Sequence, residues 1–155
     1  MKAKKGFTLV EILIVVVILG ILAAIVIPQF SQASTEAKLN SCRSSLQSLR
    51  SQIELYKIQH NDNPPALADF AAQMTTYSDA NGNTNATKDV ANGFIYGPYM
   101  QRVPKNPWND SDTLAAADAA GVGWVYDEGT GAIYVGVADA PAAVATELQN
   151  NGDAL

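Results

Sequence analysis

The sequence contains very little cysteine and histidine. Its 155 residues include one cysteine, Cys42, and one histidine, His60. One cysteine excludes an intramolecular disulfide, and one histidine excludes a metal centre with several imidazole ligands. A Gly-rich phosphate loop, a Cys-x-x-Cys pair and a nucleophile elbow are also missing from the sequence. The lack of these motifs favours a protein without enzymatic activity.

Positive charge is scarce and unevenly placed. Lysine and arginine number 10 against 15 aspartates and glutamates, and three of the lysines are Lys2, Lys4 and Lys5. Without the first six residues, 7 basic side chains remain against 15 acidic ones, a net charge of about −8. Because an acidic surface repels phosphates, we expect no nucleic acid partner for this part of the chain.

Charge is nearly absent from the stretch Phe7 to Ile27, which holds one ionisable side chain, Glu11. At about 1.5 Å per residue, a helix of this length spans the ~30 Å hydrocarbon core of a bilayer. Its many β-branched residues favour a strand, but a lone strand cannot satisfy its backbone in lipid, so we predict a helix. A carboxylate inside such a helix costs roughly 2.5–3.5 kcal/mol. We therefore expect Glu11 to have a functional role and a cationic partner.

The segment from Gly6 to Glu11, preceded by lysines, resembles the N-terminus of the type IV pilin family, which includes the pseudopilins of type II secretion. The resemblance implies that residues 1–6 are a leader peptide, which a prepilin peptidase removes by cutting between Gly6 and Phe7. It further implies N-methylation of Phe7 and an assembly role for Glu11, whose carboxylate meets the N-terminal amine of a neighbouring subunit. Residues 7–27 would then be the transmembrane and polymerisation helix. Pro28 matches a family proline and is expected to kink this helix or unwind it locally.

Three simpler interpretations of the N-terminal segment stay open from the residues alone. A secretory signal peptide cut near residues 31–33 explains the basic start but leaves Glu11 without a role. A plain membrane anchor agrees with the length and also leaves Glu11 unexplained. A lipoprotein would use Cys42, which lies far beyond the apolar run.

Residues 28–61 are predicted to continue the helix in amphipathic form. An apolar stripe recurs at spacings of three and four, formed by Leu39, Cys42, Leu46, Leu49, Ile53 and Tyr56. It can pair with another chain in a coiled coil or pack on the chain's own C-terminal part. We favour the second arrangement, because the stripe covers only about two and a half heptads and the rest of the chain needs a core. Asn61 to Pro65 is expected to end the helix.

Residues 62–155, together with 28–61, are predicted to form a globular α+β head. A short helix is expected after Pro65, and residues 75–92 are interpreted as an exposed loop. Residues 123–127 and 132–135 flank a Gly-containing turn and form the clearest hairpin of the chain. The predicted fold is thus a long N-terminal helix packed on a small C-terminal antiparallel sheet. The tail from Ala138 is expected to hold one or two helical turns and to fray.

No catalytic or metal-binding residue is assigned in the head. Major pseudopilins often hold a calcium ion near their sheet, and four acidic residues of this chain could approach one another there: Asp110, Asp112, Asp127 and Glu128. These residues do not correspond one to one with the family's ligands, so none is assigned as a ligand. No cofactor is predicted to be required, and a calcium ion in the head stays an open possibility. His60 is interpreted as a surface residue whose charge suits the C-terminal end of a helix.

These patterns predict a structural subunit of a filament rather than an enzyme. Residues 104–108 (Pro-x-x-Pro-Trp) are similar to the loop before the sheet of major pseudopilins, and pilus-forming relatives often carry a cysteine pair that is missing here. Both features favour a type II secretion pseudopilin that forms a periplasmic pseudopilus and helps drive protein export. A subunit of a type IV pilus, for adhesion, motility or DNA uptake, is the alternative within the family. A monomeric membrane-anchored binding protein is the alternative of another class.

The same resemblance defines the expected partners and location. The partners are further copies of the chain, the prepilin peptidase, an inner-membrane assembly platform with its ATPase, and membrane lipid before assembly. The chain is expected to cross the bacterial inner membrane once, with its head outside the cytoplasm, before it enters a periplasmic or cell-surface filament.

Overall fold

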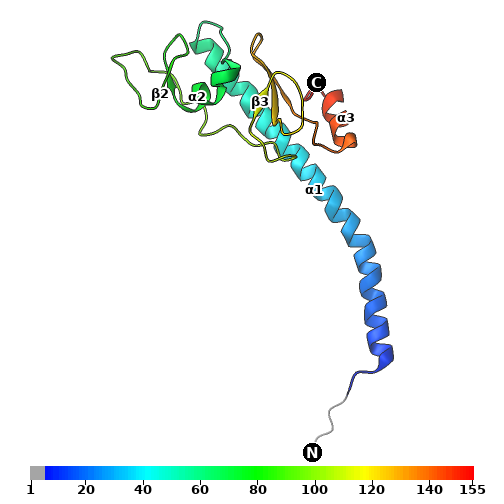
Figure 1. Ribbon diagram of the computed structural model, residues 1–155. Helices are drawn as coiled ribbons and strands as arrows, with labels where there is room; N and C mark the ends of the chain where they lie inside the picture. Colours follow the sequence, from blue (N-terminus) through cyan, green and yellow to red (C-terminus); the bar gives the residue numbers. More distant parts are fainter. Residues whose placement is uncertain (1–5) are drawn as a thin grey trace, which may run out of the picture. The chain divides into compact units, whose positions relative to one another are not determined.

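The computed structural model describes residues 6–155. The elements are α1 (Leu9–Gln59), η1 (Leu67–Asp69), α2 (Phe70–Thr75), β1 (Tyr77–Ser78), β2 (Thr84–Asn85), β3 (Leu114–Ala115), β4 (Trp124–Asp127), β5 (Ala132–Val135) and α3 (Ala142–Asn150). The chain divides into two compact units, one that ends at Ala37 and one formed by residues 38–155. This is the predicted α+β architecture of a long N-terminal helix and small sheets (Figure 1).

The first unit contains the apolar part of α1. The large apolar side chains between Phe7 and Phe30 are all exposed, with fractions of 41–83%. In the part of the chain that the structure describes, α1 alone is long and apolar enough to cross a membrane, judged by length and composition. The helix runs without interruption across Pro28, whose expected kink stays a prediction. The first unit does not cover these side chains itself. A helix that is apolar on every side needs another nonpolar environment around it.

The second unit is built around the remainder of α1. The buried residues of α1 are the six of the predicted stripe: Leu39, Cys42, Leu46, Leu49, Ile53 and Tyr56. They share one core with residues of β4, β5, α2 and α3. Packing on the chain's own head is therefore confirmed. In Figure 1 the sheet that contains β3 and the helix α3 lie beside the cyan part of α1.

The principal sheet has the order β3-β4-β5. Strands β4 and β5 form the predicted antiparallel hairpin, with Trp124 opposite Val135 and Asp127 opposite Ala132. Strand β3 pairs with β4 in parallel, so the expectation of a purely antiparallel sheet was wrong. Strand β3 consists of one leucine and one alanine, so it is too short to show the alternation of apolar and polar residues that predicts a strand. Only its pairing with β4 makes it a strand.

Three further expectations were corrected by the structure. Residues 75–92 are not only a loop, since β1 and β2 form a small hairpin whose turn is closed by Asp79. The tail does not fray in the structure, because α3 has nine residues and Leu148 is fully buried. Helix α1 ends at Gln59 rather than 61, and Asn61 and Asp62 adopt positive φ angles of 55° and 66°.

His60 is the clearest correction. Only 1% of its surface is exposed, so it is not the surface residue expected at the helix end. Its ring stacks on Tyr56 with centroids 3.7 Å apart. Its Nδ1 lies 2.8 Å from the Tyr56 carbonyl and its Nε2 3.0 Å from the Ser78 hydroxyl. The β1–β2 hairpin covers the histidine, a long-range contact that the local sequence does not reveal.

Candidate functional site

The start of α1 is capped by a reciprocal pair, Thr8 and Glu11. The Thr8 backbone N–H donates to Glu11 Oε2 at 2.8 Å, and the Thr8 hydroxyl donates to the same oxygen at 2.9 Å. The Glu11 backbone N–H donates in return to the Thr8 hydroxyl at 3.2 Å. This is a capping box, which satisfies two backbone donors at a helix N-terminus. The sequence signal for this cap is a threonine three residues before a glutamate, at Thr8 and Glu11.

The capping box changes the interpretation of Glu11. Hydrogen bonds from Thr8 satisfy its carboxylate, and the positive end of the helix dipole lies beside it. Within residues 6–155 no salt bridge reaches this carboxylate. Glu11 therefore has a local structural role, and among the described residues its charge has no cationic partner.

The predicted cleavage site lies in accessible backbone. Gly6, Phe7 and Thr8 precede α1 in a non-helical conformation, and 82% of Phe7 is exposed. A Cβ added to Gly6 would meet no atom within 4 Å in the described chain. A peptidase needs such an exposed and extended segment, whereas a peptide bond inside a helix would first have to unfold.

The acidic residues considered for calcium do not converge. Asp110 accepts a hydrogen bond from Lys105 at 2.8 Å, and Glu128 accepts one from the Leu67 N–H at 2.9 Å. Asp127 accepts hydrogen bonds from the residues of its own turn, Gly129 and Thr130. Among the described residues, no group of three His, Cys, Asp or Glu side chains is arranged to hold a metal. The acidic side chains at Asp110, Asp127 and Glu128 are thus held by donors of the protein itself and do not form a common site.

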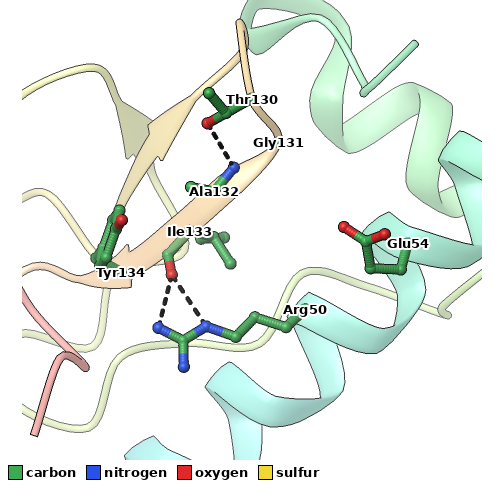
Figure 2. Close-up of a pocket in the computed structure, with 7 residues that line it drawn as sticks. All are labelled: Arg50, Glu54, Thr130, Gly131, Ala132, Ile133 and Tyr134. Carbon is green, nitrogen blue, oxygen red and sulfur yellow. Dashed lines mark hydrogen bonds between the residues drawn. The ribbon is translucent and has the colours of Figure 1, made fainter. Parts of the chain in front are cut away.

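The head is closed instead by contacts that we call the C-terminal latch, formed by Arg43, Arg50, Glu147, Gly152 and Asp153. Arg43 forms salt bridges with Glu147 at 3.0 Å and with Asp153 at 3.3 Å. Arg50 donates to the carbonyls of Ile133 and Gly152, both at 3.2 Å, and lies 3.6 Å from Asp153. Figure 2 shows its guanidinium directed at the Ile133 carbonyl of β5. The two arginines thus tie the C-terminus to α1 and cap an exposed strand edge.

A buried asparagine joins the loops at the other end of the sheet. Asn106 is fully buried, and its side-chain amide donates to the carbonyls of Gly123 at 3.0 Å and Gly136 at 2.8 Å. A Cβ on either glycine would come within 2.2 Å of a backbone carbonyl, so only glycine allows this approach. Trp108 is half-buried at the edge of the core, and Lys38 Nζ lies 5.4 Å from the centre of its ring.

Cys42 is not a reactive thiol. It is fully buried in the stripe, and burial raises its pKa to about 12, with the Asp153 carboxylate acting in the same direction. Thiolate is the reactive form, so this residue is unsuited to nucleophilic chemistry or lipid attachment.

Comparison with known proteins places this geometry in a family. Residues 1–27 match the model described as "Prokaryotic N-terminal methylation motif", and residues 29–127 match "Type II secretion system (T2SS), protein G". The chain belongs to the type II secretion protein G family. Its members are pseudopilins, which are structural subunits of the secretion system. The sequence had left several interpretations open, and the pseudopilin interpretation is the one confirmed.

Known relatives align with this chain over most of the length of both proteins. A type II secretion system core protein G of Vibrio cholerae is 30% identical over 141 residues, 85% of this chain and 90% of the relative. The core protein G of Pseudomonas aeruginosa is 28% identical over 128 residues, 83% of this chain and 84% of the relative. No solved structure matches significantly. The protein G match ends at residue 127, before β5, α3 and the C-terminal residues of the latch, Glu147, Gly152 and Asp153.

Proposed function

We propose that this chain is the repeating subunit of a periplasmic pseudopilus and has no enzymatic activity. Residues 7–27 hold the precursor in the inner membrane with the head outside the cytoplasm. A prepilin peptidase cuts between Gly6 and Phe7, and Phe7 is then N-methylated. An inner-membrane platform and its ATPase supply the energy, and copies of the chain polymerise through their apolar helices.

The exposed apolar helix carries this proposal. Its large side chains from Phe7 to Ile27 are uncovered in the single chain, and burying them contributes roughly 1.5–3 kcal/mol for each fully buried residue. Lipid can cover them before assembly, and neighbouring helices can cover them in a filament. The methylation motif over residues 1–27 supports processing at the same end of the chain. A monomeric binding protein would need only the anchor, not this processing motif.

Replacing Gly6 with glutamate should block processing. The peptidase must fit closely around a residue without a side chain, so a bulky and charged one should leave the precursor uncut. An immunoblot should show the larger precursor, and mass spectrometry of the wild type should find methylated Phe7 at the N-terminus. Gly20→Ala is the matched control, because a Cβ there meets nothing within 4 Å and processing should be normal. A wild-type N-terminus at Ser34 would instead identify an ordinary secretory signal.

We further propose that the head folds without calcium. The carboxylates Asp118 and Asp139 already accept hydrogen bonds from the backbone N–H groups of Val137 and Gly121, and Asp139 also from Asn109. These contacts join the loops before β4 and after β5 through protein donors alone.

Chelation should therefore leave the stability of the head unchanged. Purified mature protein in detergent should melt at the same temperature, within about 1 °C, in EDTA and in excess calcium. An Asp153→Asn variant serves as the control, because weakening the latch should lower the melting temperature by several degrees in both buffers. A large calcium-dependent rise in the wild type would contradict a calcium-independent head.

A further inference from the structure

The chain contains three Asn-Gly steps: Asn81-Gly82, Asn92-Gly93 and Asn151-Gly152. In such a step the glycine nitrogen can attack Cγ of the asparagine side chain, forming an N–Cγ bond and expelling ammonia. Water then opens the resulting succinimide at one of its two carbonyls, giving aspartate or isoaspartate. No oxidant is needed, and glycine favours the attack because no side chain shields its nitrogen. The surroundings of each step decide its rate.

Asn81-Gly82 is held from two sides. The Asp79 carboxylate accepts hydrogen bonds from the backbone N–H groups of Asn81 and Asn83, both at 2.9 Å. The Gly82 carbonyl accepts one from Gln73 at 2.9 Å, and Gln73 is itself buried. The ring-closing movement would break contacts that reach into the core.

Asn92-Gly93 is held through the asparagine side chain itself. The Asn92 amide donates to Asp89 Oδ2 at 2.7 Å, and its backbone N–H donates to Asp89 Oδ1 at 3.2 Å. A charge-assisted hydrogen bond of this length keeps Cγ in place, away from the position needed for attack.

Asn151-Gly152 has no comparable tether on its side chain. Asn151 is exposed, and among the described residues no hydrogen bond to its amide is found. A Cβ built on Gly152 would meet nothing within 4 Å, so no packing restrains this side of the turn. Asn151 caps α3 with ψ near 0°, which places the Gly152 nitrogen away from the Asn151 side chain. Ring closure therefore requires rotation about this bond.

That rotation is opposed by the latch, by the end of α3 and by β5, whose Val135 N–H donates to the Asp153 carbonyl at 2.8 Å. The Gly152 N–H donates to Gln149, and the Asp153 N–H donates to Leu148 at 2.8 Å. The Gly152 carbonyl accepts from Arg50, and Asp153 contacts both Arg43 and Arg50. Turning Asn151 moves Gly152 and Asp153 away from these partners, so the latch has to open before the ring can form.

We propose that Asn151 is a site of spontaneous deamidation, gated by the opening of the C-terminal latch. The isoaspartate product adds one methylene to the backbone between Asn151 and Gly152. With that extra length, Gly152 and Asp153 cannot both keep their contacts with Leu148 and Arg50. The modification thus weakens the latch permanently, so the tail of an aged subunit detaches more easily than that of a new one.

The test follows all three sites in the full-length protein in detergent, incubated in mildly alkaline buffer. Cleavage after Glu147 releases residues 148–155, and trypsin separates Asn81 from Asn92 at Lys88. Mass spectrometry then measures amide hydrolysis and the isoaspartate fraction at each site over time. A synthetic peptide of residues 148–155 gives the rate without the latch. Asn151 should react fastest of the three sites in the protein, and more slowly than in the peptide.

Arg50 variants test the gate. Arg50→Lys and Arg50→Ala should raise the rate at Asn151 by about tenfold, the effect of losing roughly one charge-assisted hydrogen bond. The rates at Asn81 and Asn92 should not change, which separates local opening from unfolding of the head. Asn151→Gln should abolish the slow decline in melting temperature that accompanies incubation. Faster reaction at Asn81 or Asn92, or equal acceleration at all three sites in Arg50→Lys, would overturn the proposal.

Discussion

A Glu11→Leu variant should be inserted and cut normally but should fail to polymerise. After cleavage, the amine of Phe7 is the one cation that the apolar segment offers, and pairing across subunits satisfies both charges only at the correct axial offset. Removing one partner of a buried charge pair costs roughly 3–5 kcal/mol, because the other charge stays uncompensated. We expect filament yield, measured by shearing and microscopy, to fall by well over tenfold while immunoblots show normal processing.

The capping box makes this experiment sharper, because Glu11 could act through Thr8 alone. Glu11→Gln keeps an acceptor for Thr8 but removes the charge, and Thr8→Val removes the hydroxyl donor but keeps the charge. If the charge pair governs assembly, the glutamine variant should fail and the valine variant should assemble. The opposite pattern would assign Glu11 to helix capping, and normal filaments with normal helical rise in the leucine variant would exclude the charge pair.

Trp124→Ala should remove a large part of the stability of the head. Trp124 is fully buried in the core against the stripe of α1, and its Nε1–H donates to the Pro104 carbonyl at 2.7 Å. Large-to-small substitutions of buried aromatic residues cost about 3–5 kcal/mol, since they lose burial and leave a cavity. This is a large part of the 5–15 kcal/mol that stabilises a typical domain.

Chemical denaturation of the mature protein in detergent measures this loss through the midpoint and slope of unfolding. Trp124→Phe retains most of the apolar volume and removes the hydrogen bond, so it separates the two contributions. Ile58→Ala is the matched control on α1, because 76% of that side chain is exposed and its loss should change stability by less than about 0.5 kcal/mol. A negligible effect of Trp124→Ala would mean that the hairpin is not part of the core.

Elements with a regular spacing of apolar residues were predictable from the sequence. The six stripe residues repeat every three or four positions, and all six are buried. The predicted hairpin segments 123–127 and 132–135 contain β4 and β5, because a turn between two apolar segments determines its own register. The apolar segment after Phe7 was equally clear, since lipid admits only a helix there.

Elements that depend on a distant partner were not predictable. Arg43 and Arg50 looked like the polar face of a helix, yet they bind residues about a hundred positions away. Asn106 gave no signal, although its amide joins two loops across the sheet. His60 was placed on the surface because a local pattern shows what a helix end prefers, not which hairpin will cover it.

By itself, the sequence therefore determined the N-terminal methylation motif, the membrane-length helix, the buried face of that helix and the central hairpin. Each of these features depends on interactions between residues close in sequence, or on a regular spacing of apolar residues that any apolar partner surface can cover. Only the tertiary structure decided the parallel strand β3, the burial of His60, the Asn106 contacts and the latch that closes the C-terminus. These depend on single hydrogen bonds between segments far apart in the chain, whose geometry exists only once the core has brought the segments together.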